Sequence, residues 1–198
     1  MIGIAGPSGS GKTALARRLA ARLPAPVLSL DDYYRDLSYL ALGERERQNF
    51  DDPAMIDWPL LRENLRAFRQ GREMAKPVYD FTTHTRSAKV ERLPPGPMLI
   101  VEGLFALYDE EVRALSSTRV FVSLDDAVCF ARRLARDMRE RGRSRESVLR
   151  QYNETVRPMA ERYVLPTRAF ADVVVSGDAR LEESAAAVIA HARGQHPP

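Results

Sequence analysis

Eight residues near the N-terminus have the types and the spacing needed to bind phosphate. Residues 6–13 are Gly-Pro-Ser-Gly-Ser-Gly-Lys-Thr and match the pattern G-x-x-x-x-G-K-[ST] at every position. Glycines in such a loop let successive backbone N–H groups point at phosphate oxygens. Lys12 would place its charge on the β- and γ-phosphates of a nucleotide, and Thr13 would offer a hydroxyl to Mg²⁺. The expected contacts to the nucleotide are Gly6, Ser8, Gly9, Ser10, Gly11, Lys12 and Thr13.

The residues on either side of this loop have the patterns of a strand and a helix, which a phosphate-binding loop (P-loop) requires. An apolar run over residues 1–5 ends at Gly6, and apolar residues recur at helical spacing over residues 14–23 until Pro24. The helix would turn the positive end of its dipole toward the phosphates. The alternative is a glycine-rich turn that happens to contain Lys-Thr, and the flanking patterns disfavour it.

Carboxylates follow two further apolar runs, where a sheet of parallel strands would bind its ligand. The run 27–30 is followed by Asp31 and Asp32, and the run 98–101 is followed by Glu102. Adjacent acids usually cap or begin a turn, but beside a P-loop one of the pair could act as a general base or reach Mg²⁺ indirectly. Glu102 has the position of a second carboxylate that approaches Mg²⁺, since a buried acid without such a role is costly.

Arginines recur along a predicted helix that starts after Asp125 and Asp126. Residues 132, 136, 139 and 143 are spaced by four, three and four, which brings them to nearly one helical face. One interpretation is a solvated face whose arginines pair with Asp137 and Glu140. The other is a lid whose guanidinium groups cover a triphosphate and offset charge during phosphoryl transfer. The arginines concerned are Arg132, Arg136, Arg139 and Arg143, flanked by Arg133 and Arg141.

A segment in the middle of the chain combines a strand pattern with groups that stack and form hydrogen bonds. Residues 76–86 are Lys-Pro-Val-Tyr-Asp-Phe-Thr-Thr-His-Thr-Arg, which alternates like one arm of a hairpin. A plain edge strand would not need Tyr79, Phe81, His84 and Arg86 so close together. On spacing alone, a hairpin with exposed aromatic residues and a binding site both remain open.

The remaining elements complete an α/β pattern. Two more apolar runs, 120–124 and 173–175, alternate with helical segments that begin near Asp57, Ser144 and Arg180. We therefore expect a parallel sheet of about five strands flanked by helices, as in P-loop nucleotide-binding proteins. One domain over residues 1–198 suffices for this length. Within it we expect a hairpin at about 74–93, lid helices at about 126–157 and a frayed tail at 194–198.

Composition narrows the functional class. The chain has 30 Lys and Arg residues against 27 Asp and Glu residues and no long basic tract, so we expect no nucleic-acid partner. Its one cysteine, Cys129, excludes an intramolecular disulfide, and no Cys/His spacing indicates zinc. No apolar run approaches the roughly 20 residues of a membrane span, and no leader precedes the first strand. We expect a soluble, cytoplasmic protein without a membrane partner.

Several motifs in a fixed order give this chain a family resemblance. After the P-loop come Asp31-Asp32-Tyr33-Tyr34, Asn49-Phe50-Asp51-Asp52-Pro53, Pro77-Val78-Tyr79-Asp80-Phe81-Thr82-Thr83-His84, Glu102-Gly103 and Glu140-Arg141-Gly142-Arg143. Gln151-Tyr152 and Arg157-Pro158-Met159 follow. The chain closely resembles the uridine kinase (uridine–cytidine kinase) family of P-loop kinases over about residues 1–177. The segment 77–86 is far more specific than the P-loop.

The resemblance implies transfer of the γ-phosphoryl group of ATP or GTP, with Mg²⁺, to the 5′-hydroxyl of uridine or cytidine in pyrimidine salvage. It implies Asp31 as the base, Thr13 and Glu102 on the Mg²⁺ side, and a homo-oligomer, often a tetramer. It implies that Lys12, Arg132, Arg136 and Arg141 act on the phosphates. The implied contacts to the nucleoside are Tyr34, Asp51, Tyr79, Phe81, His84, Arg143 and Gln151.

The sequence also departs from this family and leaves rival functions open. Asp52 stands where family members commonly have His, Ala54 stands where they have an acid, and residues 35–48 align poorly. One rival is a related kinase for another acceptor, like phosphoribulokinase or pantothenate kinase, which should lack the aromatic segment 79–84. The other is a nucleotide-binding regulator without transfer activity, which would have no need of a base such as Asp31.

Overall fold

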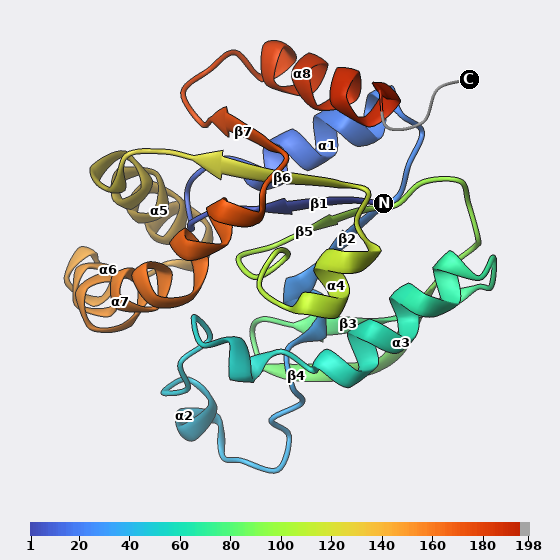
Figure 1. The fold of residues 1–198 in the computed structure, drawn as a ribbon. Coiled ribbons are helices and arrows are strands. Elements are labelled where there is room, and N and C mark those ends of the chain that lie inside the picture. Colours follow the sequence, from blue (N-terminus) through green and yellow to red (C-terminus); the bar gives the residue numbers. More distant parts are fainter. Residues whose placement is uncertain (195–198) are drawn as a thin grey trace.

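A five-stranded parallel sheet organises the computed structural model, which describes residues 1–194 (Figure 1). The strand order is β2-β5-β1-β6-β7. The strands are β1 (Ile2–Ala5), β2 (Val27–Ser29), β5 (Ile100–Glu102), β6 (Thr118–Ser123) and β7 (Val173–Ser176). The expected α/β fold with about five parallel strands is therefore confirmed. Gly194 ends the last helix, and the rest of the expected tail lies outside the described residues.

Helices cover both faces of the sheet and the carboxyl ends of its strands. In Figure 1, α1 and α8 lie on one face, α3 and α4 lie on the other, and α5, α6 and α7 lie beyond the strand ends. The helices are α1 (Lys12–Arg22), α2 (Leu42–Arg45), α3 (Trp58–Arg69), α4 (Glu110–Leu115), α5 (Asp126–Arg141), α6 (Arg145–Gln151), α7 (Arg157–Met159) and α8 (Leu181–Gly194). None of these helices combines the length and apolar character needed to cross a bilayer.

The central strands β1, β5 and β6 bury side chains on both faces, because successive residues of a strand point to opposite sides. Ile4 and Ile100 pack under α1 and α8 in one apolar cluster with Leu15. Val101 and Phe121 belong to a second cluster with residues of α3 and the hairpin. The near-continuous apolar runs of the sequence are therefore those of strands covered on both sides.

The strand register brings the chemically active residues to one edge of the sheet. Glu102, the last residue of β5, lies opposite Ile4 of β1 on one side and Ser29 of β2 on the other. The P-loop follows β1 and the Asp31–Asp32 turn follows β2. Because all three strands are parallel, these segments meet at the carboxyl edge, where open α/β sheets bind their ligands.

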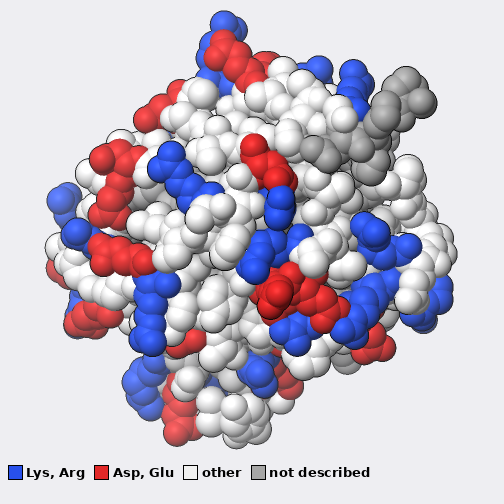
Figure 2. All heavy atoms as spheres, in the orientation of Figure 1, with Lys and Arg blue, Asp and Glu red and all other residues white. Residues whose placement is uncertain are grey.

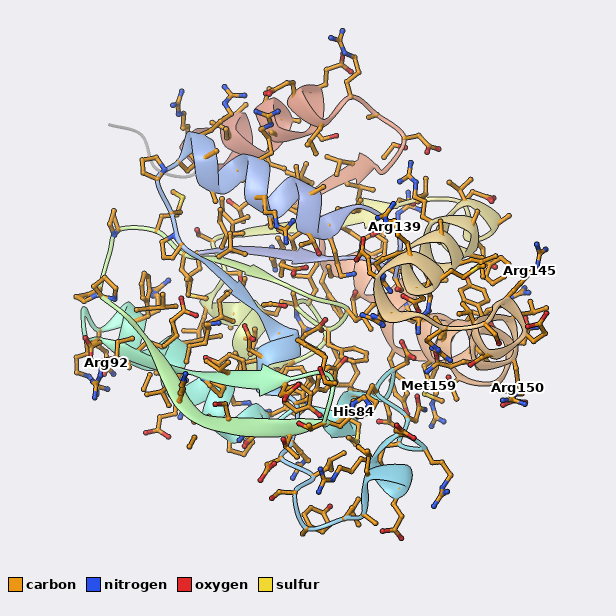
Figure 3. The ribbon with its side chains drawn as sticks, turned by 180° about the vertical axis from the view of Figure 1, so that it is seen from behind. His84, Arg92, Arg139, Arg145, Arg150 and Met159 are labelled. Carbon is orange, nitrogen blue, oxygen red and sulfur yellow. The ribbon has the colours of Figure 1, made fainter. Side chains whose placement is uncertain are left out.

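An antiparallel hairpin stands apart from the main sheet. It consists of β3 (Met74–Asp80) and β4 (Thr85–Leu93), with an irregular register between Pro77 and Tyr79. In Figure 3, His84 lies at its turn and Arg92 lies toward the opposite end. Arg86 fastens the hairpin to the turn after β2 by donating hydrogen bonds to the carbonyl oxygens of Tyr33 and Tyr34, at 3.3 and 2.9 Å.

The stretch after α6 differs from the regular helix that its spacing suggests. Tyr152–Val156 and Ala160–Val164 are π-helical and Leu165–Phe170 is a 3₁₀ turn. Pro158 and Pro166 lack the backbone N–H that a continuous α-helix requires, so the hydrogen-bond ladder shifts its spacing around them.

Surface charge agrees with the near balance of the sequence. On the face seen in Figure 2, acidic and basic side chains are interspersed rather than gathered into areas of one sign. Many of the exposed charges pair with each other, as Arg92 does with Glu73 and Arg139 with Glu140.

The P-loop packs against α5 at a position that tolerates only glycine. Gly9 has a left-handed φ of 86°, and a Cβ added there would lie 2.4 Å from the carbonyl oxygen of Cys129. Both the backbone conformation and the contact distance exclude a larger residue. The loop and the helix that carries the arginines therefore share a tight backbone contact.

We expect Gly9→Ala to lower the free energy of unfolding by about 2 kcal/mol or more, because it adds a steric clash to a strained φ. Urea unfolding followed by circular dichroism measures this. Gly43→Ala is the matched control, since a Cβ at Gly43 in α2 meets only the tip of Arg47 at 4.0 Å. Equal unfolding midpoints for Gly9→Ala and the wild type would contradict the tight packing of loop on helix.

Candidate active site

The loop between β1 and α1 has the geometry of a phosphate cradle. Gly11, which directly precedes α1, has a left-handed φ of 101°. The hydroxyl of Ser10 is buried and has no hydrogen-bond partner within residues 1–194. A buried hydroxyl without a partner costs free energy until a ligand completes it. The loop therefore fits an anionic group placed before the N-terminus of α1.

Glu102 and Thr13 form an oxygen-rich corner beside this loop. The Thr13 hydroxyl lies 3.3 Å from both carboxylate oxygens of Glu102. Glu102 is 5% exposed, and no lysine or arginine of the described residues forms an ion pair with it. Burial raises the pKa of Glu102, while the charge of Lys12 opposes that rise. This donor set fits Mg²⁺, which binds one or two protein oxygens together with substrate phosphates and water.

The structure separates the two adjacent acids after β2. They lie in η1 (Leu30–Tyr33), whose N-cap is the hydroxyl of Ser29, so neither aspartate is the cap. Asp32 forms an ion pair with Lys76 of β3 at 2.8 Å. Asp31 has no such partner among the described residues. Burial raises the pKa of Asp31, and the charges of Lys12, Arg141 and Arg136 oppose this. Asp31 is thus the acid left available for a ligand.

Aromatic side chains gather between the hairpin turn and the turn after β2. The rings of Tyr34 and Tyr79 lie 5.5 Å apart, and those of Tyr79 and Phe81 lie 5.3 Å apart. His84 stacks on Phe50 with centroids 4.7 Å apart and an interplanar angle of 23°. Burial lowers the pKa of His84 and so favours the neutral ring, which offers one donor and one acceptor.

Polar groups line the other side of this aromatic cluster. Asp51 is 7% exposed and lies 3.7 Å from the Arg133 guanidinium. Arg133 also donates hydrogen bonds to the Ser8 hydroxyl at 3.1 Å and to the Gln151 side-chain oxygen at 3.2 Å. Arg143 donates to the same oxygen of Gln151. The predicted nucleoside contacts Asp51, Arg143 and Gln151 therefore lie together, joined by Arg133.

Four of the arginines surround one buried carboxylate, that of Asp137. Asp137 is fully buried and is approached by Arg136 at 2.8 Å, Arg133 and Arg141 at 3.5 Å, and Arg143 at 3.8 Å. The expected helical face was wrong only at Arg143, because α5 ends at Arg141 and Gly142 turns the chain with a φ of 62°. Arg132, Arg136 and Arg139 keep their i, i+4, i+7 spacing within α5.

Two members of the expected stripe make their contacts away from Asp137. Arg132 donates to the carbonyl oxygen of Gly177 at 3.1 Å and pairs with Asp178. Arg139 is exposed and pairs with Glu140. Figure 3 shows Arg139 on α5, Arg145 and Arg150 on α6, and His84 at the hairpin turn. The ion-paired solvated face considered above is therefore correct for Arg139.

Two residues of the site escaped the sequence analysis. Arg133 was treated as flanking the stripe, although its spacing of four from both Cys129 and Asp137 places the three on the buried face of α5. Phe50 is the residue next to Asp51, and its aromatic character beside a predicted sugar contact was the available signal. Arg45 adds a further contact by donating to the Thr83 carbonyl at 3.0 Å, which ties residues 35–48 to the hairpin turn.

Comparison with known proteins places the chain in a family. The model of the phosphoribulokinase / uridine kinase family matches residues 1–181. A protein of Deinococcus deserti named uridine kinase is 49% identical over 178 residues, which are 88% of this chain and 86% of the relative. A uridine kinase of Lactobacillus johnsonii is 44% identical over 179 residues, with 88% and 85% covered.

Solved structures agree in fold. A putative fructose transport system kinase from Silicibacter sp. TM1040 superposes with a TM-score of 0.73 and 22% identity over 88% of both chains. That identity bears on the fold alone. The family match over most of the chain, together with relatives of 44 and 49% identity, shows that the chain belongs to the phosphoribulokinase / uridine kinase family.

Proposed function

We propose that this protein is a uridine kinase, which transfers the γ-phosphoryl group of ATP or GTP to the 5′-hydroxyl of uridine or cytidine. The names of its relatives support the activity. Within the structure, the observation that carries the proposal is the place of Asp31. This half-buried carboxylate is free of ion pairs among the described residues and stands between the P-loop and the aromatic hairpin.

Asp31 has the properties of a general base for this reaction. It accepts the proton of the 5′-hydroxyl while that oxygen bonds to the γ-phosphorus, and the bond from the γ-phosphorus to the bridging oxygen breaks to release the nucleoside diphosphate. Burial raises its pKa and makes the carboxylate a better proton acceptor than an exposed aspartate. The charges of Lys12, Arg136 and Arg141 all reach Asp31, so they also lie near the reacting group.

The phosphate side of the site is formed by the P-loop and the arginines around Asp137. Lys12 and the backbone N–H groups of residues 6–13 hold the phosphates, and Arg136 and Arg141 offset charge on the transferring group. Mg²⁺, when bound at Thr13 and Glu102, would neutralise the β- and γ-phosphate oxygens. Arg132 is exposed and contacts the Gly177–Asp178 turn.

The nucleoside side is formed by the aromatic cluster and its polar rim. Tyr34, Tyr79 and Phe81 enclose a pyrimidine, and the neutral ring of His84 pairs with its polar edge. Asp51, Arg143 and Gln151 bind the ribose hydroxyls. A sugar phosphate or pantothenate has no planar base for this cluster, so the aromatic residues favour a nucleoside acceptor over the rival kinase activities. As part of the same proposal, this protein acts in the cytoplasm and assembles as a tetramer.

We expect Asp31→Asn to lower kcat by ~10²–10⁴, because it keeps the shape of the side chain and removes the proton acceptor. Asp32→Asn is the matched control and should lose less than about tenfold, since its amide oxygen still accepts from Lys76. Coupled detection of ADP at saturating uridine gives both values. If Asp32→Asn lost activity and Asp31→Asn kept it, Asp32 and not Asp31 would be the base.

We expect His84→Ala to raise KM for uridine and cytidine by about tenfold and to narrow their advantage over purine nucleosides. The physical reason is that a site built to hydrogen-bond one edge of a base rejects others through unpaired polar groups. Arg92→Ala, toward the other end of the hairpin, is the control. KM for ATP should not change in either variant. If His84→Ala left KM for uridine and cytidine and the base preference unaltered, His84 would not contact the base.

A further inference from the structure

Lys76 is a buried lysine that the proposed reaction does not use. It is 8% exposed and lies in β3, at the root of the hairpin. Its ammonium group lies 2.8 Å from an oxygen of Asp32 and 2.9 Å from an oxygen of Glu91. Glu91 is mostly exposed, whereas the Asp32 side chain is 19% exposed. The ion pair between Lys76 and Asp32 is therefore the more buried of the two.

The ion pair joins two segments that belong to opposite ends of the proposed chemistry. Asp32 is adjacent to Asp31 in a 3₁₀ turn of four residues, whose only side-chain cap is Ser29. Lys76 belongs to the hairpin that carries Tyr79, three residues further along the same strand. Besides this pair, Asn64 links the same two segments by donating to the Tyr33 hydroxyl at 2.9 Å and to the Ala75 carbonyl at 3.0 Å.

Loss of Lys76 would act on Asp31 through Asp32. A buried carboxylate without its cation is strongly unfavourable and must find water or another donor. Asp32, whose side chain is 19% exposed, gains more contact with water by moving the short turn that it shares with Asp31. A shift of about 1 Å at a reacting group can cost ~10²-fold in rate. The two adjacent carboxylates would also repel each other once the lysine charge is gone.

We propose that Lys76 is a positioning residue, whose ion pair with Asp32 fixes the turn that holds Asp31 against the nucleoside hairpin. This role rests on the proposed kinase function. Lys76 touches neither substrate in it. Arg86 and the aromatic contacts hold the tip of the hairpin without Lys76, so nucleoside binding depends on the pair much less than proton transfer does.

The test is a set of charge variants assayed for uridine phosphorylation, with kcat expressed per folded protein. Lys76→Met should lower kcat about tenfold or more and change KM for uridine by less than about threefold. Lys76→Arg, which keeps the charge, should retain most of kcat. The double variant Lys76→Met with Asp32→Asn should have a higher kcat than Lys76→Met alone, because no unpaired carboxylate remains.

Controls separate this role from a purely structural one. Lys89→Met removes the other hairpin lysine, which is exposed and forms no ion pair within residues 1–194, and it should leave kcat unchanged. A structural role would lower thermal stability without restoration of kcat by Asp32→Asn. If Lys76→Met does not fold, Lys76→Gln takes its place, because it keeps a hydrogen-bond donor for Asp32. It loses the charge, so kcat should again fall while KM for uridine changes little.

Three results would overturn the proposal: a folded Lys76→Met with kcat within about twofold of wild type, a rise in KM with kcat unchanged, or a kcat loss that Asp32→Asn does not restore. Wild-type turnover in the same assay distinguishes this from failure of the proposed function. A wild type that does not phosphorylate uridine rejects both, whereas an active wild type with an unaltered Lys76→Met rejects only the role of Lys76.

Discussion

The parallel pairing of β5 between β1 and β2 is the constraint on which the rest of the site depends. Glu102 lies in register with Ile4 and with Ser29, so the ends of the three strands coincide. This register brings the P-loop, the Asp31 turn and the buried Glu102 together at one edge of the sheet. Apolar clusters on both faces of the sheet then hold the strands in place, because a slip in register would misplace residues of both cores.

Charge balance within the site follows from burial. Asp51 and Glu102 are buried and Asp31 is half-buried, and desolvation raises the pKa of all three carboxyls. A nearby cation, Lys12 or Arg133, opposes each rise. At Asp137 the ratio of charges is reversed, because this one buried carboxylate holds several guanidinium groups near each other. Each of these groups therefore has only partial charge compensation within the described residues.

Features that depend on local sequence were predictable, and those that depend on packing were not. The P-loop, the strand-end acids and the hairpin at 74–93 follow from contiguous motifs and a period of two or 3.6 residues. The buried face of α5 was missed, because arginine spacing alone fits several faces and only contact with the P-loop selects Arg133. The Lys76–Asp32 pair spans 44 positions, and no local pattern indicates a contact at that separation.

The most direct test of the central claim is the rate of ADP release by the wild type with MgATP and a panel of acceptors. The panel contains uridine, cytidine, adenosine, ribulose 5-phosphate and pantothenate. If the aromatic cluster holds a pyrimidine and His84 pairs with its polar edge, kcat/KM for uridine or cytidine should exceed that of each other acceptor by about 10²-fold or more. Phosphorylation of ribulose 5-phosphate or pantothenate without turnover of either pyrimidine nucleoside would contradict it.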